Sequence, residues 1–167
     1  SRSGTSEEIM YEESGIHIVG ISGSLRSASM NSGLLRAASS LAPRGVTIEI
    51  ASLQEIPFYN GDLDGPVQPA PVTALKRVVA RADGLLLASP EYNYSFTGVL
   101  KNGIDWLSRP LDTSPLQNKP VALVGSGGRY GTVRSQLHMR QVLQSTNSLV
   151  MPKPEFMLAL ARNKFDV

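Results

Sequence analysis

A short loop with several hydroxyl groups and one arginine separates an apolar run from an amphipathic run early in the sequence. The apolar run, residues 17–21, is typical of a buried strand, and residues 31–41 have the apolar spacing of a helix. A helix that begins after such a loop offers unpaired backbone N–H groups and the positive end of its dipole. Ser24 and Ser29 can add hydroxyl donors, and Arg26 a planar charged fork. The loop is therefore predicted to bind a phosphate ester.

Two common phosphate-binding patterns are missing from this loop. Gly20 and Gly23 do not have the G-x-G-x-x-G spacing of dinucleotide-binding proteins, and the Gly-Lys-Ser/Thr triplet of a P-loop does not occur in the sequence. An arginine in place of the P-loop lysine favours a terminal phosphate monoester over a magnesium-bound triphosphate. The alternative is an ordinary turn before a capped helix, which every strand–helix unit needs.

Two later loops also follow apolar runs. Residues 89–97 (SPEYNYSFT) follow the run 84–89, and their tyrosines and asparagine can place polar groups beside a flat apolar surface. A planar heteroaromatic ring such as isoalloxazine would fit there; the alternative is aromatic packing at a subunit interface. Residues 125–131 (GSGGRYG) follow the run 120–125, and their glycines let the backbone approach a ligand closely. The alternative is that these residues form only a flexible turn.

Strand and helix patterns alternate along the rest of the sequence. Further strands are predicted at 47–52 and 149–151. Three further helices are predicted: one begins at Pro71, one begins near Phe96, and one spans 132–146. This alternation predicts an α/β fold, namely a flavodoxin-like three-layer sandwich with a five-stranded parallel sheet in the order 2-1-3-4-5. In that order, the loops after strands one, three and four meet at one edge of the sheet. We therefore expect the three loops to form one crevice.

Composition excludes several kinds of chemistry. The 167 residues contain no cysteine, so disulfides, thiolate metal sites and a cysteine nucleophile are absent. The two histidines, His17 and His138, have no metal-ligand spacing, and no metal site is predicted. A net charge of +2 without a basic block argues against nucleic acid as a partner, and no long apolar span indicates a membrane segment. A cytoplasmic enzyme or carrier is expected.

Three longer motifs resemble one protein family. Residues 23–31 (GSLRSASMN), 89–95 (SPEYNYS) and 100–109 (LKNGIDWLSR) look like those of the NADPH-dependent FMN reductase family, which includes bacterial chromate and quinone reductases and some azoreductases. The resemblance implies a flavodoxin-like fold with tightly but noncovalently bound FMN. It also implies two-electron reduction of quinones, azo compounds, free flavin or metal oxyanions such as chromate, with NADPH or NADH as co-substrate.

The resemblance assigns roles to individual residues. The FMN phosphate would be held by Ser24, Arg26, Ser29, Asn31 and Ser32. The flavin ring would be bordered by Pro90, Glu91, Tyr92, Asn93 and Tyr94, with Ser126 and Gly127 beside it. Arg134 and Glu155 match subunit contacts of tetrameric members, whereas Leu137 stands where some of these have tyrosine. The resemblance implies a homodimer or homotetramer, and Leu137 favours the dimer over the tetramer.

The two ends of the sequence differ from the rest of the chain. Residues 1–15 are polar and lack periodicity, which favours a flexible leader before a single FMN-binding domain at residues 16–167. Family members generally continue past residues 163–167 into a last amphipathic helix. We therefore expect either a truncated C-terminus or a partner that covers the sheet near the first helix.

The resemblance implies a ping-pong mechanism in which the flavin carries the chemistry, so no catalytic side chain is assigned. His17 is expected to be structural, Asp105 and Trp106 to serve packing or an interface, and His138 to lie on the surface or at an interface. A flavodoxin-type electron carrier with little NAD(P)H turnover stays open, although such carriers are usually strongly acidic. A hydrolase is a weaker alternative, because no cysteine or aspartate lies between Gly20 and Asn31.

Overall fold

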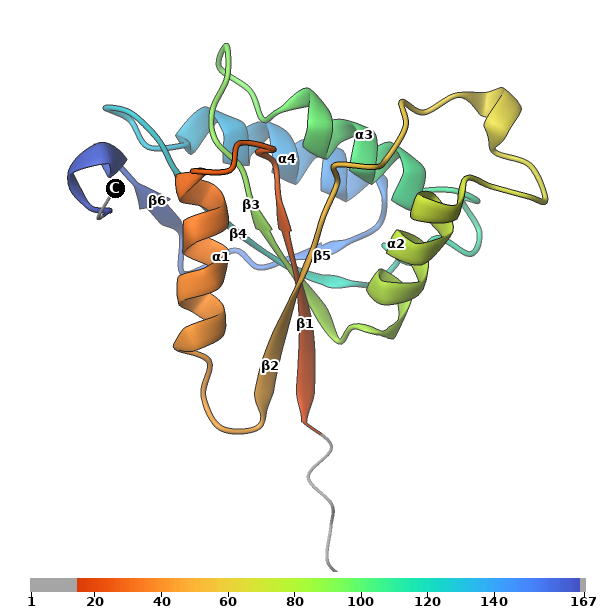
Figure 1. Cartoon of the computed structure of the whole chain (residues 1–167), viewed down its shortest axis with the longest axis horizontal. Helices are drawn as coiled ribbons and strands as arrows, with labels where there is room; N and C mark the ends of the chain where they lie inside the picture. The colour runs from red at the N-terminus through yellow and green to blue at the C-terminus, as the bar shows by residue number, and fades with distance from the viewer. Residues whose placement is uncertain (1–14, 166–167) are drawn as a thin grey trace, which may run out of the picture.

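The computed structural model describes residues 15–165, in which strands and helices alternate as predicted (Figure 1). The strands are β1 (Ile16–Ser22), β2 (Val46–Ala51), β3 (Gly84–Ala88), β4 (Pro120–Ser126), β5 (Leu149–Val150) and β6 (Phe156–Leu158). The helices are α1 (Met30–Ser40), α2 (Ala70–Arg81), α3 (Gly98–Leu107) and α4 (Val133–Ser145), with short 3-10 turns η1 (Gly61–Leu63) and η2 (Ala161–Asn163). Apart from Gly15, the predicted leader lies outside the described residues.

The sheet is parallel, and its strands follow the order β2-β1-β3-β4-β5, which confirms the predicted flavodoxin-like topology. The sequence did not indicate β6, which pairs with the second half of β4, from Val124 to Ser126. The short β5 pairs with only the first two residues of β4. Pro152 and Pro154 separate β5 from β6, and proline cannot donate a ladder hydrogen bond. The edge of the sheet beside β4 is therefore shared by two short strands.

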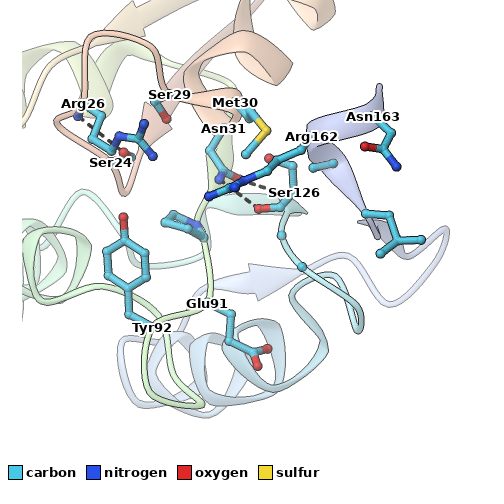
Figure 2. A pocket seen from close by; sticks show the side chains of 15 residues that line it. Ser24, Arg26, Ser29, Met30, Asn31, Glu91, Tyr92, Ser126, Arg162 and Asn163 are labelled. Atoms are coloured by element: carbon cyan, nitrogen blue, oxygen red, sulfur yellow. Dashed lines mark hydrogen bonds between the residues drawn. The ribbon is translucent and has the colours of Figure 1, made fainter. Parts of the chain in front are cut away.

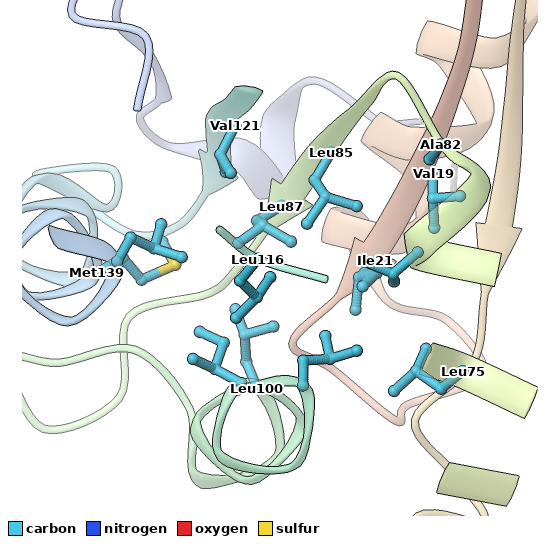
Figure 3. Close-up of a cluster of buried hydrophobic side chains, with 14 of the residues drawn as sticks. Val19, Ile21, Leu75, Ala82, Leu85, Leu87, Leu100, Leu116, Val121 and Met139 are labelled. Carbon is cyan, nitrogen blue, oxygen red and sulfur yellow. The ribbon is translucent and has the colours of Figure 1, made fainter. Parts of the chain in front are cut away.

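Alternating side chains of the strands pack against different layers. Val19 and Ile21 of β1 enter the main core with Leu87 of β3, between the sheet and helices α2, α3 and α4 (Figure 3). Gly20 faces the opposite side, where Leu35 of α1 packs directly over it. The helices therefore form the two outer layers of a three-layer sandwich (Figure 1).

A long loop between β2 and α2 is anchored on α3. The buried Trp106 donates a hydrogen bond from Nε1 to the carbonyl oxygen of Pro57 at 2.8 Å, and its ring meets Tyr59 edge-on at 4.9 Å between centroids. The packing role expected for Trp106 is confirmed. His17 pairs with Glu49 across β1 and β2 at 3.0 Å, which agrees with its expected structural role.

No helix within residues 15–165 is long and apolar enough to cross a bilayer. The cytoplasmic location stays a prediction.

Replacing Leu87 with alanine should lower the free energy of unfolding by about 2–5 kcal/mol, because it leaves a cavity in the main core. Leu87 is 2% exposed, whereas Leu41 is 82% exposed at the end of α1. Leu41→Ala should change stability by less than about 0.5 kcal/mol. Urea denaturation of both variants checks this, and equal effects would contradict the assigned core.

Candidate functional site

The loops after β1, β3 and β4 meet at one edge of the sheet and enclose a pocket of about 510 Å³ (Figure 2). This arrangement is the crevice that the strand order predicted. The predicted site residues that line it are Ser24, Arg26, Ser29, Asn31, Pro90, Glu91, Tyr92, Ser126 and Gly127. Ser32, Asn93 and Tyr94 lie outside its lining. The pocket is also lined by Met30, Gly128 and the four residues Leu160 to Asn163, which the sequence did not indicate.

Side-chain hydrogen bonds connect the three loops to one another. The Asn31 amide is 3% exposed; its Nδ2 donates to the Ser126 carbonyl oxygen at 3.1 Å, and its Oδ1 accepts from the Ser126 N–H at 2.9 Å. The Thr97 hydroxyl donates to the Gly23 carbonyl oxygen at 2.7 Å. The first loop is therefore fixed to both of the others.

The first loop has the features of an anion site. The Ser29 hydroxyl caps α1 by accepting from the Ser32 N–H at 3.2 Å. Within residues 15–165, the N–H groups of Met30 and Asn31 in the first turn have no hydrogen-bond acceptor. Arg26 lines the same end of the pocket. Ser32 does not line the pocket, and its hydroxyl donates to the Ser22 hydroxyl at 3.0 Å. This bond ties the start of α1 to the end of β1.

The second loop makes a tight bend. Tyr92 and Ser95 exchange backbone hydrogen bonds of 2.9 and 3.0 Å around Asn93 and Tyr94. Both intervening residues have positive φ angles, 51° and 69°, as in a two-residue hairpin turn, and tyrosine rarely adopts this conformation. The guanidinium carbon of Arg134 lies 3.9 Å from the centre of the Tyr94 ring, which stabilises the bend.

Glu91 directs its carboxylate at the start of α4. It accepts from the backbone N–H groups of Arg134 and Ser135 at 3.0 and 3.3 Å, and it forms an ion pair with the Arg134 guanidinium. The Ser135 hydroxyl also donates to the Pro90 carbonyl oxygen at 3.2 Å. Because the Glu91 side chain is only 8% exposed, its charge needs these partners. The second loop is thereby fixed to α4.

The third loop is held by the chain after β6. The Gly127 N–H donates to the Leu158 carbonyl oxygen at 3.0 Å, and the N–H groups of Leu160 and Ala161 donate to the Gly128 and Gly127 carbonyl oxygens at 2.9 and 3.0 Å. These bonds bring η2 to the pocket wall. No local pattern in the sequence indicates them, because they depend on the pairing of β6 with β4.

Other residues with possible chemical roles lie elsewhere. His138 is exposed, as expected, and its Nδ1 lies 3.0 Å from the Ser95 hydroxyl. Within residues 15–165, no three histidine, aspartate or glutamate side chains are grouped so that they could hold a metal ion. The pocket is therefore the strongest candidate site that the described residues offer.

Comparison with known proteins identifies the family. The NADPH-dependent FMN reductase family model matches residues 16–163. The chain belongs to this family. An NAD(P)H-dependent FMN reductase of Pseudomonas aeruginosa is 48% identical over 152 residues, covering 90% of this chain and 82% of the relative. A quinone reductase of Escherichia coli K12 is 42% identical over 154 residues, covering 90% of this chain and 81% of that relative.

A solved structure supports the same conclusion. The flavoenzyme NAD(P)H:(acceptor) oxidoreductase FerB of Paracoccus denitrificans superposes with a TM-score of 0.77 and 30% identity, covering 84% of this chain and 78% of that one. Membership of the NADPH-dependent FMN reductase family makes the chain an NAD(P)H-dependent reductase. The predicted family, fold and enzyme class are thus confirmed.

The pocket of this reductase fits a mononucleotide such as FMN. Its volume lies within the range of about 300–1,000 Å³ usual for ligand sites. The Ser126 hydroxyl is buried at the pocket wall and has no hydrogen-bond partner within the described residues, as expected for a group that pairs with a bound ligand. Arg26 and the free N–H groups of α1 would hold the phosphate, while Pro90, Tyr92 and Gly127 would border the ring.

The two predicted interface residues already have partners within this reductase. Arg134 is bound to Glu91 and lies over Tyr94. Glu155 accepts from the Lys153 ammonium at 2.6 Å, and this contact lowers the pKa of the Glu155 carboxyl. Their role in subunit contacts stays a prediction.

Replacing Glu91 with alanine should destabilise this reductase by about 1–2 kcal/mol, because two N–H groups of α4 lose their cap. The exposed Glu55 provides a matched control, since Glu55→Ala removes a charge without breaking such contacts. Thermal or urea unfolding at neutral pH compares the two variants. If Glu91→Ala is as stable as Glu55→Ala, the clamp between the second loop and α4 does not contribute to folding.

Proposed function

We propose that residues 16–167 form one FMN-binding domain that transfers two electrons from NADPH or NADH to small acceptors. The observation that carries this proposal is the pocket itself. It combines Arg26 and the start of α1 with the unpartnered Ser126 hydroxyl and the aromatic ring of Tyr92. Quinones are the proposed main acceptors, because relatives over 40% identical include proteins named quinone reductase. Azo compounds, free flavin and oxyanions such as chromate are further candidates.

Each part of the site has a distinct task in this proposal. Arg26, Ser24 and the N–H groups at the start of α1 bind the phosphate. Asn31 keeps the third loop at a fixed distance from that phosphate site. Bound FMN would supply the hydride-accepting and electron-donating ring. The protein side chains orient the cofactor, and no side chain is required as a nucleophile.

Access to the pocket agrees with sequential use by two substrates. Tyr92, which lines the pocket, is 51% exposed, and it also lines a second hollow of about 610 Å³ that shares Ser24 and Arg26 with the pocket. Leu25 and Phe58 line that hollow, which leaves apolar surface open beside the site. A nicotinamide and then a planar acceptor could stack there in turn, as a ping-pong mechanism requires.

The electron-carrier alternative has weaker support, because the family consists of reductases. Protein incubated with FMN and desalted should be yellow, lose its colour on addition of NADPH, and oxidise NADPH continuously when benzoquinone is supplied. Absorbance at 340 nm measures that turnover. A protein that binds FMN but turns over only once would instead be a carrier. A protein that takes up no FMN would contradict the proposal.

Arg26→Ala should weaken FMN binding by about 1.5–3 kcal/mol, because a charge-assisted hydrogen bond to the phosphate is lost. Riboflavin lacks the phosphate, so its affinity should hardly change. Arg44, exposed in the turn before β2, provides the control variant Arg44→Ala. Titration of flavin fluorescence gives the dissociation constants. Equal losses for FMN and riboflavin would show that Arg26 does not act on the phosphate.

We also place this reductase in a homodimer or homotetramer. Large apolar side chains stay exposed on the second loop and on α4, namely Tyr92 at 51%, Tyr94 at 67% and Leu137 at 57%. Analytical ultracentrifugation should show a species of at least two chains, and a monomer at micromolar concentration would contradict the assembly.

A further inference from the structure

The candidate FMN pocket contains a second arginine besides the one assigned to the phosphate. Arg26 and Arg162 both line it. Among the lining residues that the structure describes, the carboxylate is that of Glu91, which is already neutralised by Arg134 and by two N–H groups of α4. Arg26 and the N–H groups at the start of α1 can hold one phosphate group. Arg162 is a second cation of the pocket, and no carboxylate within residues 15–165 pairs with it.

The backbone holds Arg162 firmly at the pocket wall. It lies in η2, directly after Leu160 and Ala161, whose N–H groups bond to the third loop. Leu160 has a φ angle of 50°, and this left-handed residue turns the chain back toward the pocket. Figure 2 shows the Arg162 side chain extending from η2 into the pocket, beside the labelled Asn31 and Ser126. Within residues 15–165 its guanidinium has no hydrogen-bond or ion-pair partner.

Arg162 and Arg26 enter the pocket from different walls. Arg26 belongs to the first loop, with Ser24 and the capped start of α1. Arg162 belongs to the segment bonded to Gly127 and Gly128 of the third loop. In the proposed function the phosphate lies at the first loop and the ring at the second and third. Because the backbone around Arg162 is bonded to the third loop, we assign Arg162 to the ring rather than to the phosphate.

We propose that Arg162 binds the ring of the reduced cofactor more strongly than that of the oxidised cofactor, and so raises the reduction potential of bound FMN. This inference rests on the proposed function. Hydride transfer from NAD(P)H carries two electrons and one proton to a neutral oxidised ring and releases NAD(P)⁺, so the reduced ring gains one negative charge. A guanidinium at the ring stabilises that charge, whereas it has little to bind in the neutral ring.

The test measures binding and potential rather than turnover. Arg162→Gln should leave the affinity for oxidised FMN within about twofold and weaken the affinity for reduced FMN about tenfold, as expected for one lost charge-assisted hydrogen bond. A tenfold difference corresponds to a decrease of about 30 mV for a two-electron couple. Arg162→Lys should recover part of the decrease, and Arg44→Gln, which removes an exposed arginine before β2, should show none.

Three outcomes decide the matter. A lower potential in Arg162→Gln, with unchanged affinity for the oxidised cofactor, supports the proposal. If the affinities for oxidised and reduced FMN fall equally, Arg162 acts on the phosphate or on the pocket wall. If the reduction potential is unchanged, Arg162 has no role toward the ring. Either result overturns the proposal. If the wild-type chain binds no FMN, the proposed function fails first, and that result is seen before any variant is made.

Discussion

The site depends on a buried pair of hydrogen bonds between Asn31 and the backbone of Ser126. These bonds join loops that are 95 residues apart in the chain and that follow different strands. The parallel strand order brings both loops to the same edge of the sheet, but it does not set the distance between them. The Asn31 amide sets it, because its Nδ2 and Oδ1 both bond to the backbone of one residue, Ser126. The first and third loops of the pocket are thereby placed relative to each other.

The charges around the pocket follow from the same geometry. Glu91 would add negative charge to an anion site if its carboxylate pointed inward, but it caps α4 and pairs with Arg134 instead. The clamp removes that charge from the pocket and fixes the bend that carries Tyr92. The pocket therefore keeps the positive potential of Arg26, Arg162 and the start of α1. This balance suits a cofactor that has a phosphate at one end and becomes more negative when it is reduced.

The sequence predicted most of the fold because buried parallel strands are apolar runs that stand out between amphipathic helices. Ser24 and Arg26, which line the pocket, were predicted from the local chemistry of a strand–helix junction, and Asn31 was predicted from the family resemblance. Arg162 was not found, since its place in the site requires β6 to pair with β4 after two prolines, and no local pattern indicates that pairing. Likewise, amino-acid type alone does not show that Glu91 turns away from the pocket toward a helix 43 residues later.

The central claim is that FMN binds in the pocket formed by these three loops, and backbone amide chemical shifts test it most directly. Titration of ¹⁵N-labelled protein with FMN should shift the amides of residues 24–31, 91–92, 126–128 and 160–163, and leave those around Arg44 unchanged. Riboflavin should shift the last three groups but not the amides of Met30 and Asn31. Saturable shifts confined to another face, or no shifts at millimolar FMN, would contradict the account.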